Sequence, residues 1–175
     1  MEYFSDHKVI FGRVERVVDG DTIRVRHCPL TCSERDKNTK LSDSTLTIRM
    51  YGIDSPELHK QKSDPPSQPF AEEAKEFTSS LVLDKIVQIK LLEKDKYSRA
   101  VGKVQTILQQ DVSLELAERG LATMYKGVGA DYDGKREVFE ALQADAKRKK
   151  LGVWSLGDQM VSPAEFKRQQ KQLHE

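Results

Sequence analysis

The stretch KVIFGRVERVVDGDTIRVR, residues 8–26, carries most of the information about the fold. Its two flanking segments, Lys8 to Val18 and Thr22 to Arg26, are rich in β-branched residues, a composition typical of strands. Asp19-Gly20-Asp21 lies between them and has the composition of a turn. The stretch therefore predicts two consecutive strands joined without a helix.

Further along the chain, strand-like and helix-like segments alternate. Segments with strand composition are Thr45–Ile53, Ile86–Leu92 and Ala100–Leu108. Segments with helical spacing are Phe70–Leu81, Val112–Arg119 and Lys135–Lys150. Because the early strands follow one another without helices, five short strands and three helices indicate a small closed barrel rather than a parallel sheet.

Two periodic patterns predict which side chains are buried. In the strand at 45–53, alternation places Leu46, Ile48 and Met50 on one face and Thr47, Arg49 and Tyr51 on the other. In the helix at 135–150, an inward stripe is expected at Val138, Leu142 and Ala146. The first pattern places Arg49 opposite the buried side chains of its own strand.

Two polar stretches interrupt these elements. Cys28 to Ser44 is too poor in apolar residues to pack and is expected to be a long exposed hairpin excursion. Leu58 to Pro69 contains three prolines and is expected to be a surface loop. Cys28 and Cys32, which are the only cysteines, are expected to be ordinary thiols, with a small disulfide loop as the alternative.

Composition sets the class of protein. The 175 residues are 37% hydrophobic and 33% charged, and no apolar run approaches the roughly 20 residues that span a bilayer. The first residues have neither the basic start nor the apolar stretch of a signal peptide, so they do not indicate export. With a net charge of +1, the chain has no global field for a polyanion, and any nucleic-acid site must be local.

Length predicts one compact domain, which we place at residues 1–157. Ser162-Pro163 has the composition of a helix start, so residues 158–175 are expected to form a polar helical tail. We expect the protein to be a monomer.

Carboxylates and arginines gather in three short segments that lie at strand ends or turns. The segments are VVDGDT with Asp19 and Asp21, RMYGIDSPE with Arg49, Asp54 and Glu57, and DKYSR with Asp95 and Arg99. Each segment alone is ordinary turn or surface composition. Their joint occurrence in this order is what indicates a functional site.

The chemistry of these side chains suits phosphodiester hydrolysis. Asp21, Asp54 and the Ser55 carbonyl are hard oxygen donors for a divalent cation. Arg49 and Arg99 offer planar guanidinium groups for the charge that develops on a phosphate in the transition state. Glu57, beyond a proline that stiffens the turn, is positioned to orient or deprotonate the attacking water.

The same segments resemble the staphylococcal-nuclease-like (thermonuclease) family. Six blocks carry the resemblance: VVDGDTIRV, IRMYGIDSPE, PFAEEAKEF, DKYSRAVGKV, ERGLA and KKLGVWS. The resemblance covers Lys8 to Ser155. It implies an α+β fold in which a five-stranded OB-fold barrel packs with three α-helices.

The resemblance also implies roles for individual residues. It implies calcium as the single cofactor ion, with Asp21, Asp54 and the Ser55 carbonyl as ligands, and it implies single-stranded DNA and RNA as substrates. Its catalytic positions fall on Arg49, Glu57 and Arg99, and the products end in a 3′-phosphate. Substrate-binding positions fall on Lys96, Tyr97 and Tyr125. The chain departs from the family at Ser55, where threonine is more usual, at Ser98, where glycine is more usual, and in the long hairpin after Arg26.

Three functions compete at this point. The first is a calcium-dependent nuclease that hydrolyses single-stranded or locally opened DNA and RNA. The second is a non-catalytic OB-fold module that binds single strands by stacking and backbone charge. The third is an interaction domain whose functional part is the excursion at Cys28 to Ser44. Relatives that only bind tend to lose parts of the carboxylate and arginine set, whereas this chain retains it, which favours the enzyme.

Overall fold

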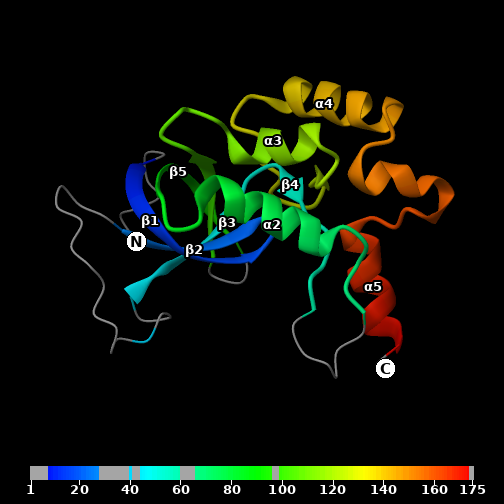
Figure 1. Ribbon diagram of the computed structural model, residues 1–175, viewed down its shortest axis with the longest axis horizontal. Helices are drawn as coiled ribbons and strands as arrows, with labels where there is room; N and C mark the ends of the chain where they lie inside the picture. The colour runs from blue at the N-terminus through cyan, green and yellow to red at the C-terminus, as the bar shows by residue number, and fades with distance from the viewer. Residues whose placement is uncertain (1–7, 28–39, 41–43, 60–65, 96–98, 174–175) are drawn as a thin grey trace.

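A computed structural model describes residues 8–27, 40, 44–59, 66–95 and 99–173. Five strands close into a barrel in the order β1-β2-β3-β6-β5 (Figure 1). They are β1 (Val9–Asp19), β2 (Thr22–His27), β3 (Leu46–Met50), β5 (Ile86–Lys94) and β6 (Ala100–Gln105). The prediction of an α+β fold built on a five-stranded OB-type barrel is confirmed.

The register of the barrel brings the first turn close to β3. β2 pairs antiparallel with β3, and Thr22 lies opposite Arg49. The Met50 amide donates to the Asp21 carbonyl at 2.8 Å, which attaches the turn to the end of β3. β1 shifts register between Val17 and Asp19. Such irregularities redirect the side chains that follow a strand, and here they precede the carboxylates of the turn.

Strand β3 is shorter than its composition suggested, and this changes which side chains are buried. Ile48 and Met50 lie in the core as expected, but Leu46 is 45% exposed. Tyr51 is fully buried rather than on the outer face, because the strand ends at Met50 and Tyr51 begins a turn. Gly52 follows with a φ of 69°, a left-handed conformation that favours glycine.

Three helices cover the barrel, as predicted. They are α2 (Ala71–Val82), α3 (Val112–Glu118) and α4 (Arg136–Arg148). Gly120 follows α3 with a φ of 66°, the left-handed conformation in which helices often end, and a Cβ there would lie 2.3 Å from the Leu151 carbonyl oxygen, so glycine is required at this position.

The expected end of one strand was wrong, and the expected buried stripe of α4 was wrong at Val138 but right at Ala146. The segment at Ala100–Leu108 leaves strand conformation after Gln105, and Ile107 and Leu108 are exposed in a turn. In α4 the buried side chains are Phe139 and Ala146, whereas Val138 is 45% exposed. Phe139 packs edge-on against Tyr51 with ring centroids 5.4 Å apart, because the larger ring fills the space beneath the helix.

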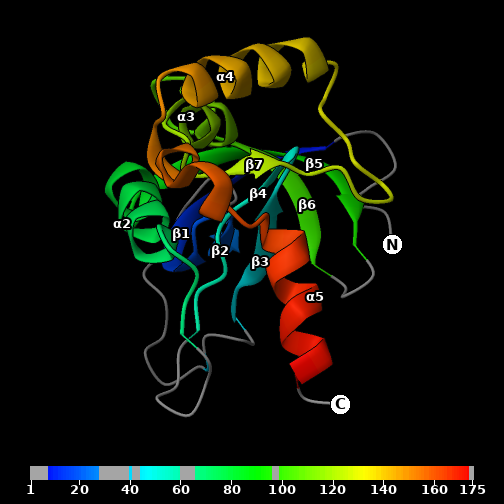
Figure 2. The same cartoon turned by 90° about the vertical axis from the view of Figure 1, so that its right-hand side faces the viewer.

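Smaller elements complete the fold. A two-stranded sheet joins β4 (Ile53–Asp54) to β7 (Thr123–Met124), and a 3-10 segment, η2 (Gly152–Gln159), follows α4. The last helix, α5 (Pro163–Leu173), stands apart from α3 and α4, with the C-terminus at its outer end (Figures 1 and 2). The division into a domain at 1–157 and a helical tail at 158–175 stays a prediction.

Within the described ranges, no helix is both long and apolar enough to cross a membrane. Cys28, Cys32 and most of the excursion to Ser44 lie outside the described residues.

Tyr51 should contribute measurably to stability. Its hydroxyl donates to Asp111 Oδ2 at 2.6 Å, and both residues are buried. Tyr51→Phe leaves the Asp111 carboxylate with a weaker set of donors, so we expect the free energy of unfolding to fall by about 1–3 kcal/mol. Urea denaturation measures this loss. In an Asp111→Ala background the same substitution should cost much less, and an equal cost in both backgrounds would show that the hydrogen bond contributes little.

Candidate active site

Five parts of the chain bring these predicted carboxylates and arginines together. Asp21 comes from the turn between β1 and β2, Arg49 from β3, Asp54 from β4, and Glu57 from the loop that follows β4. Arg99 directly precedes β6, which pairs with β3. The barrel topology therefore gathers residues that are almost 80 positions apart in the sequence.

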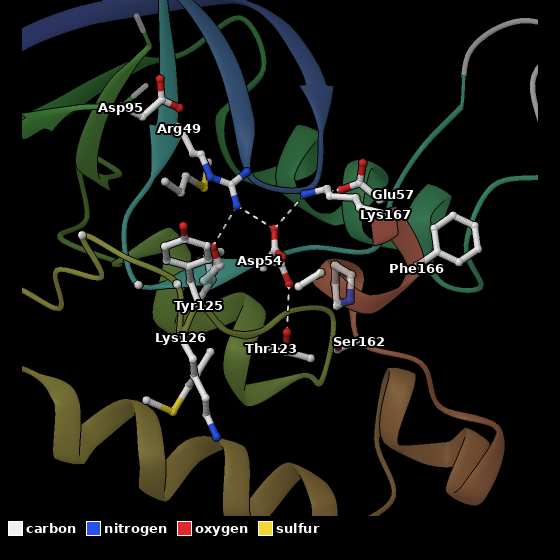
Figure 3. A pocket seen from close by; sticks show the side chains of 18 of the residues that line it. Arg49, Asp54, Glu57, Asp95, Thr123, Tyr125, Lys126, Ser162, Phe166 and Lys167 are labelled. Carbon is white, nitrogen blue, oxygen red and sulfur yellow. Dashed lines mark hydrogen bonds and ion pairs between the residues drawn. The ribbon is translucent and has the colours of Figure 1, made fainter. Parts of the chain in front are cut away.

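Arg49 connects the two buried aspartates. Its Nη1 donates to Asp21 Oδ1 at 2.7 Å, and its Nη2 donates to Asp54 Oδ1 at 2.6 Å. Figure 3 shows the guanidinium extending from β3 toward Asp54. Burial alone would lower the pKa of Arg49, but the two carboxylates raise it above its usual value. Arg49 is therefore a fixed cation at the centre of the site.

The charge on Asp21 is also stabilised by neighbours. Burial by itself would raise the pKa of Asp21, but Arg49, the Ser55 amide and the Thr22 hydroxyl hold it below its usual value. The Ser55 amide donates to Asp21 Oδ2 at 2.7 Å. This bond places the Ser55 backbone beside Asp21, as a shared ligand set requires.

The donor set fits a hard divalent cation. Asp19 also lies at this turn, and burial together with the nearby charge of Asp21 raises the pKa of Asp19 to about 7. Asp19, Asp21 and Asp54 thus place three carboxyl groups close together. Calcium accepts such irregular oxygen ligands. Among the described residues, no three acidic, histidine or cysteine side chains are arranged around a metal position, so it is the chemistry of the donors that favours the ion.

Glu57 is held in its loop by a buried glutamine. The backbone amide of Glu57 donates to Gln68 Oε1 at 3.1 Å, and the backbone amide of Gln68 donates to the Glu57 carbonyl at 2.9 Å. Gln68 is 6% exposed, whereas the Glu57 side chain is 29% exposed. These two hydrogen bonds fix the backbone at Glu57, and its carboxylate stays partly exposed.

Lys167 reaches the site from α5. Its Nζ lies 2.8 Å from Glu57 Oε1 and 3.4 Å from Asp54 Oδ1 (Figure 3). Burial would lower the pKa of Lys167, but Asp54 and Glu57 raise it. A second cation thus lies beside the proposed general base.

A cleft of about 1220 Å³ lies at the site. Arg49, Glu57, Arg99 and Tyr125 all line it. The side chain of Arg99 donates to Asp95 at 2.7 Å, and the Arg49 guanidinium carbon lies 5.9 Å from the centre of the Tyr125 ring. Lys96 and Tyr97 lie outside the described residues.

Sequence reasoning missed several residues at this site. Thr123 donates from its hydroxyl to the Asp54 carbonyl at 3.3 Å, and Gln68 and Lys167 contact the Glu57 loop. Gln68 lies in a loop, Thr123 in the short strand β7 and Lys167 in a polar tail. None of these segments shows a periodic pattern that would indicate a site residue. Asp19 lies in one of the predicted segments, but its turn composition alone does not indicate a role.

Comparison with known proteins agrees with this geometry. The family model described as "Staphylococcal nuclease homologue" matches residues 47–156. The chain is 43% identical over 170 residues to "Endonuclease Htp3" of Saprolegnia parasitica, covering 95% of this chain and 79% of that protein. It is 38% identical over 178 residues to "Probable endonuclease LCL3" of Scheffersomyces stipitis, covering 94% and 74%. It is 36% identical over 182 residues to "Probable endonuclease C19F8.04c" of Schizosaccharomyces pombe, covering 93% and 76%. The family match over more than half of the chain, the relatives and the barrel together show that this chain belongs to the staphylococcal nuclease homologue family.

Proposed function

We propose that this protein is a calcium-dependent nuclease that hydrolyses phosphodiester bonds in single-stranded or locally opened DNA and RNA and leaves 3′-phosphate ends. The observation that carries the proposal is the position of Arg49, which bridges the buried Asp21 and Asp54 at a cleft that Glu57 and Arg99 also line. The names of the relatives, which describe endonucleases, support the same activity.

In this proposal each side chain has one task. Glu57 accepts a proton from the attacking water. The water oxygen bonds to phosphorus, the bond from phosphorus to the 5′ oxygen breaks, and that oxygen takes up a proton from solvent. Arg49 and Arg99 donate hydrogen bonds to phosphate oxygens as negative charge develops on them. The products are a 3′-phosphate and a 5′-hydroxyl.

Arg49 retains hydrogen-bond donors that can contact a phosphate. A guanidinium carries five N–H groups, and the structure shows three of its hydrogen bonds, to Asp21, Asp54 and the Ile53 carbonyl. These contacts orient the planar group before substrate arrives. Preorganised donors stabilise a transition state without the cost of reorienting during the reaction.

Asp21, Asp54 and the Ser55 carbonyl would hold the calcium ion in this proposal. When bound, the ion supplies positive charge that polarises the phosphate and the attacking water. All proposed groups come from one chain, which is consistent with a monomeric enzyme. Lys96, Tyr97 and Tyr125 are proposed to contact the nucleotide beside the scissile phosphate.

The activity should depend on how easily the substrate opens. A base pair must be broken before a nucleotide enters the cleft, and opening costs a few kcal/mol, so we expect single strands to be cut at least about tenfold faster than G·C-rich duplex. A·T-rich duplex should be intermediate. The measurement compares initial rates on end-labelled substrates of equal length, with product ends tested by phosphatase treatment.

The matched control is Glu57→Gln, which keeps the shape of the side chain but removes the base. It should bind single strands and fail to cut them. Equal rates on single strands, A·T-rich duplex and G·C-rich duplex would contradict the proposal that a base pair must open before a nucleotide enters the cleft. If the wild-type protein bound single strands but did not cut them with calcium, the chain would be a binding module instead.

A further inference from the structure

Helix α5 is attached to the loop that carries Glu57. Gln68, which holds that loop, also donates from Nε2 to the Val161 carbonyl at 2.6 Å, just before α5 begins. The rings of His59 and Phe166 lie 6.0 Å apart, and Lys167 pairs with Glu57. Three contacts, each between the loop or its buried glutamine and the α5 segment, therefore hold the helix against the site.

One face of α5 borders the cleft. Lys167, Gln170 and Lys171 line it and are spaced three and four residues apart, which places them on the same side of a helix. Lys167 and Lys171 are separated by about 6 Å along the axis, given a rise of 1.5 Å per residue. Arg168 does not line the cleft. Its side chain is 70% exposed and pairs with Glu165.

Acidic and basic side chains both line the cleft. Glu93, Asp95 and Asp131 contribute to it, and so do the basic residues Lys94, Arg99 and Lys126. Lys167 and Lys171 line the wall that α5 forms. In Figure 3, Asp95 and Lys167 lie on opposite sides of Arg49. For a polyanionic strand with one phosphate at Arg49, Lys167 and Lys171 therefore offer two further positive charges along the α5 wall.

We propose that α5 forms a wall of the groove that binds the substrate strand, and that Lys167 and Lys171 bind backbone phosphates adjacent to the scissile phosphate. This inference rests on the proposed function, because it requires a single-stranded polynucleotide as substrate. When the strand binds, the Lys167 ammonium exchanges Glu57 for a phosphate oxygen. The Lys167 side chain is 43% exposed and long, so this exchange requires only a rotamer change. Glu57 is then available to the water.

The test measures binding without cleavage. A fluorescent single-stranded oligonucleotide is titrated, in chelator and at several salt concentrations, with the full chain and with Lys167→Met, Lys171→Met and the double variant. Arg168→Met is the matched control, since it removes the same charge from the same helix outside the cleft. We expect each lysine variant to weaken binding roughly two- to fivefold. The slope of log Kd against log salt should fall by about 0.7 per lysine.

The control should change neither quantity, and Lys171→Arg, which keeps the positive charge, should bind like the wild type. Lysine variants with the same affinity and salt slope as Arg168→Met would overturn the proposal. Faster cleavage by Lys167→Met with unchanged binding would also overturn it, because α5 would then act only by blocking Glu57. A thermal melt confirms that the variants remain folded. If the wild-type protein bound single strands but did not cleave them, the proposed nuclease function would be refuted. The salt slopes of the lysine variants would still show whether α5 binds the strand.

Discussion

Replacing Arg49 with lysine is expected to lower kcat by roughly 10²–10³ while most of the affinity for single strands remains. The guanidinium spans Asp21 and Asp54 with two nitrogens and offers further donors to a phosphate. A lysine ammonium is a point charge that cannot reproduce this planar arrangement. Ground-state attraction to phosphate survives on the retained charge, so the loss should appear in turnover.

Arg99→Lys is the matched comparison. Arg99 also lines the cleft, but it pairs with Asp95 instead of the buried aspartates. We expect a similar loss of kcat, since both arginines are proposed to bind the phosphate. Only Arg49→Lys should lower the melting temperature in chelator, because it weakens a buried ion pair.

Single-turnover rates, a binding titration and a thermal melt for each variant provide the measurements. Near-normal turnover in both variants would refute the catalytic assignment. Unfolding of Arg49→Lys would instead show that the residue holds the fold together.

Removing the divalent cation should have the largest effect, which is complete loss of cleavage. Added calcium should restore activity, whereas magnesium should restore it poorly. The Asp21, Asp54 and Ser55 set is irregular, and magnesium demands near-octahedral geometry. Asp21→Asn removes one ligand charge and should weaken calcium binding by at least about tenfold.

Calcium binding is measured by titration calorimetry, independently of cleavage. Glu57→Gln serves as the comparison, because it should keep calcium affinity near normal while abolishing turnover. Cleavage that persists in excess chelator would refute the metal mechanism. Equal rates with calcium and magnesium would refute the calcium assignment alone.

Asp21, Arg49, Asp54 and Glu57 could be picked out from the sequence because they lie in short segments at strand ends, whereas Lys167 could not. The turn at Asp19–Asp21, the strand with Arg49 and the loop with Glu57 each show a local signal of composition. Where the chain leaves regular structure, local reasoning failed. Alternation placed Tyr51 on the outer face, but the strand ends one residue earlier and the ring enters the core. A helical stripe suggested Val138, but Phe139 fills the space against Tyr51.

By itself, the sequence determined the strand and helix order, the closed barrel and the set of carboxylates and arginines, because periodicity and turn composition are local properties of the chain. Only the tertiary structure decided that Arg49 bridges Asp21 and Asp54, which depends on the register between β2 and β3. It also decided that Lys167 meets Asp54, a residue 113 positions away. No local pattern encodes such a contact, since the packing of a distant helix against the barrel determines which side chains meet.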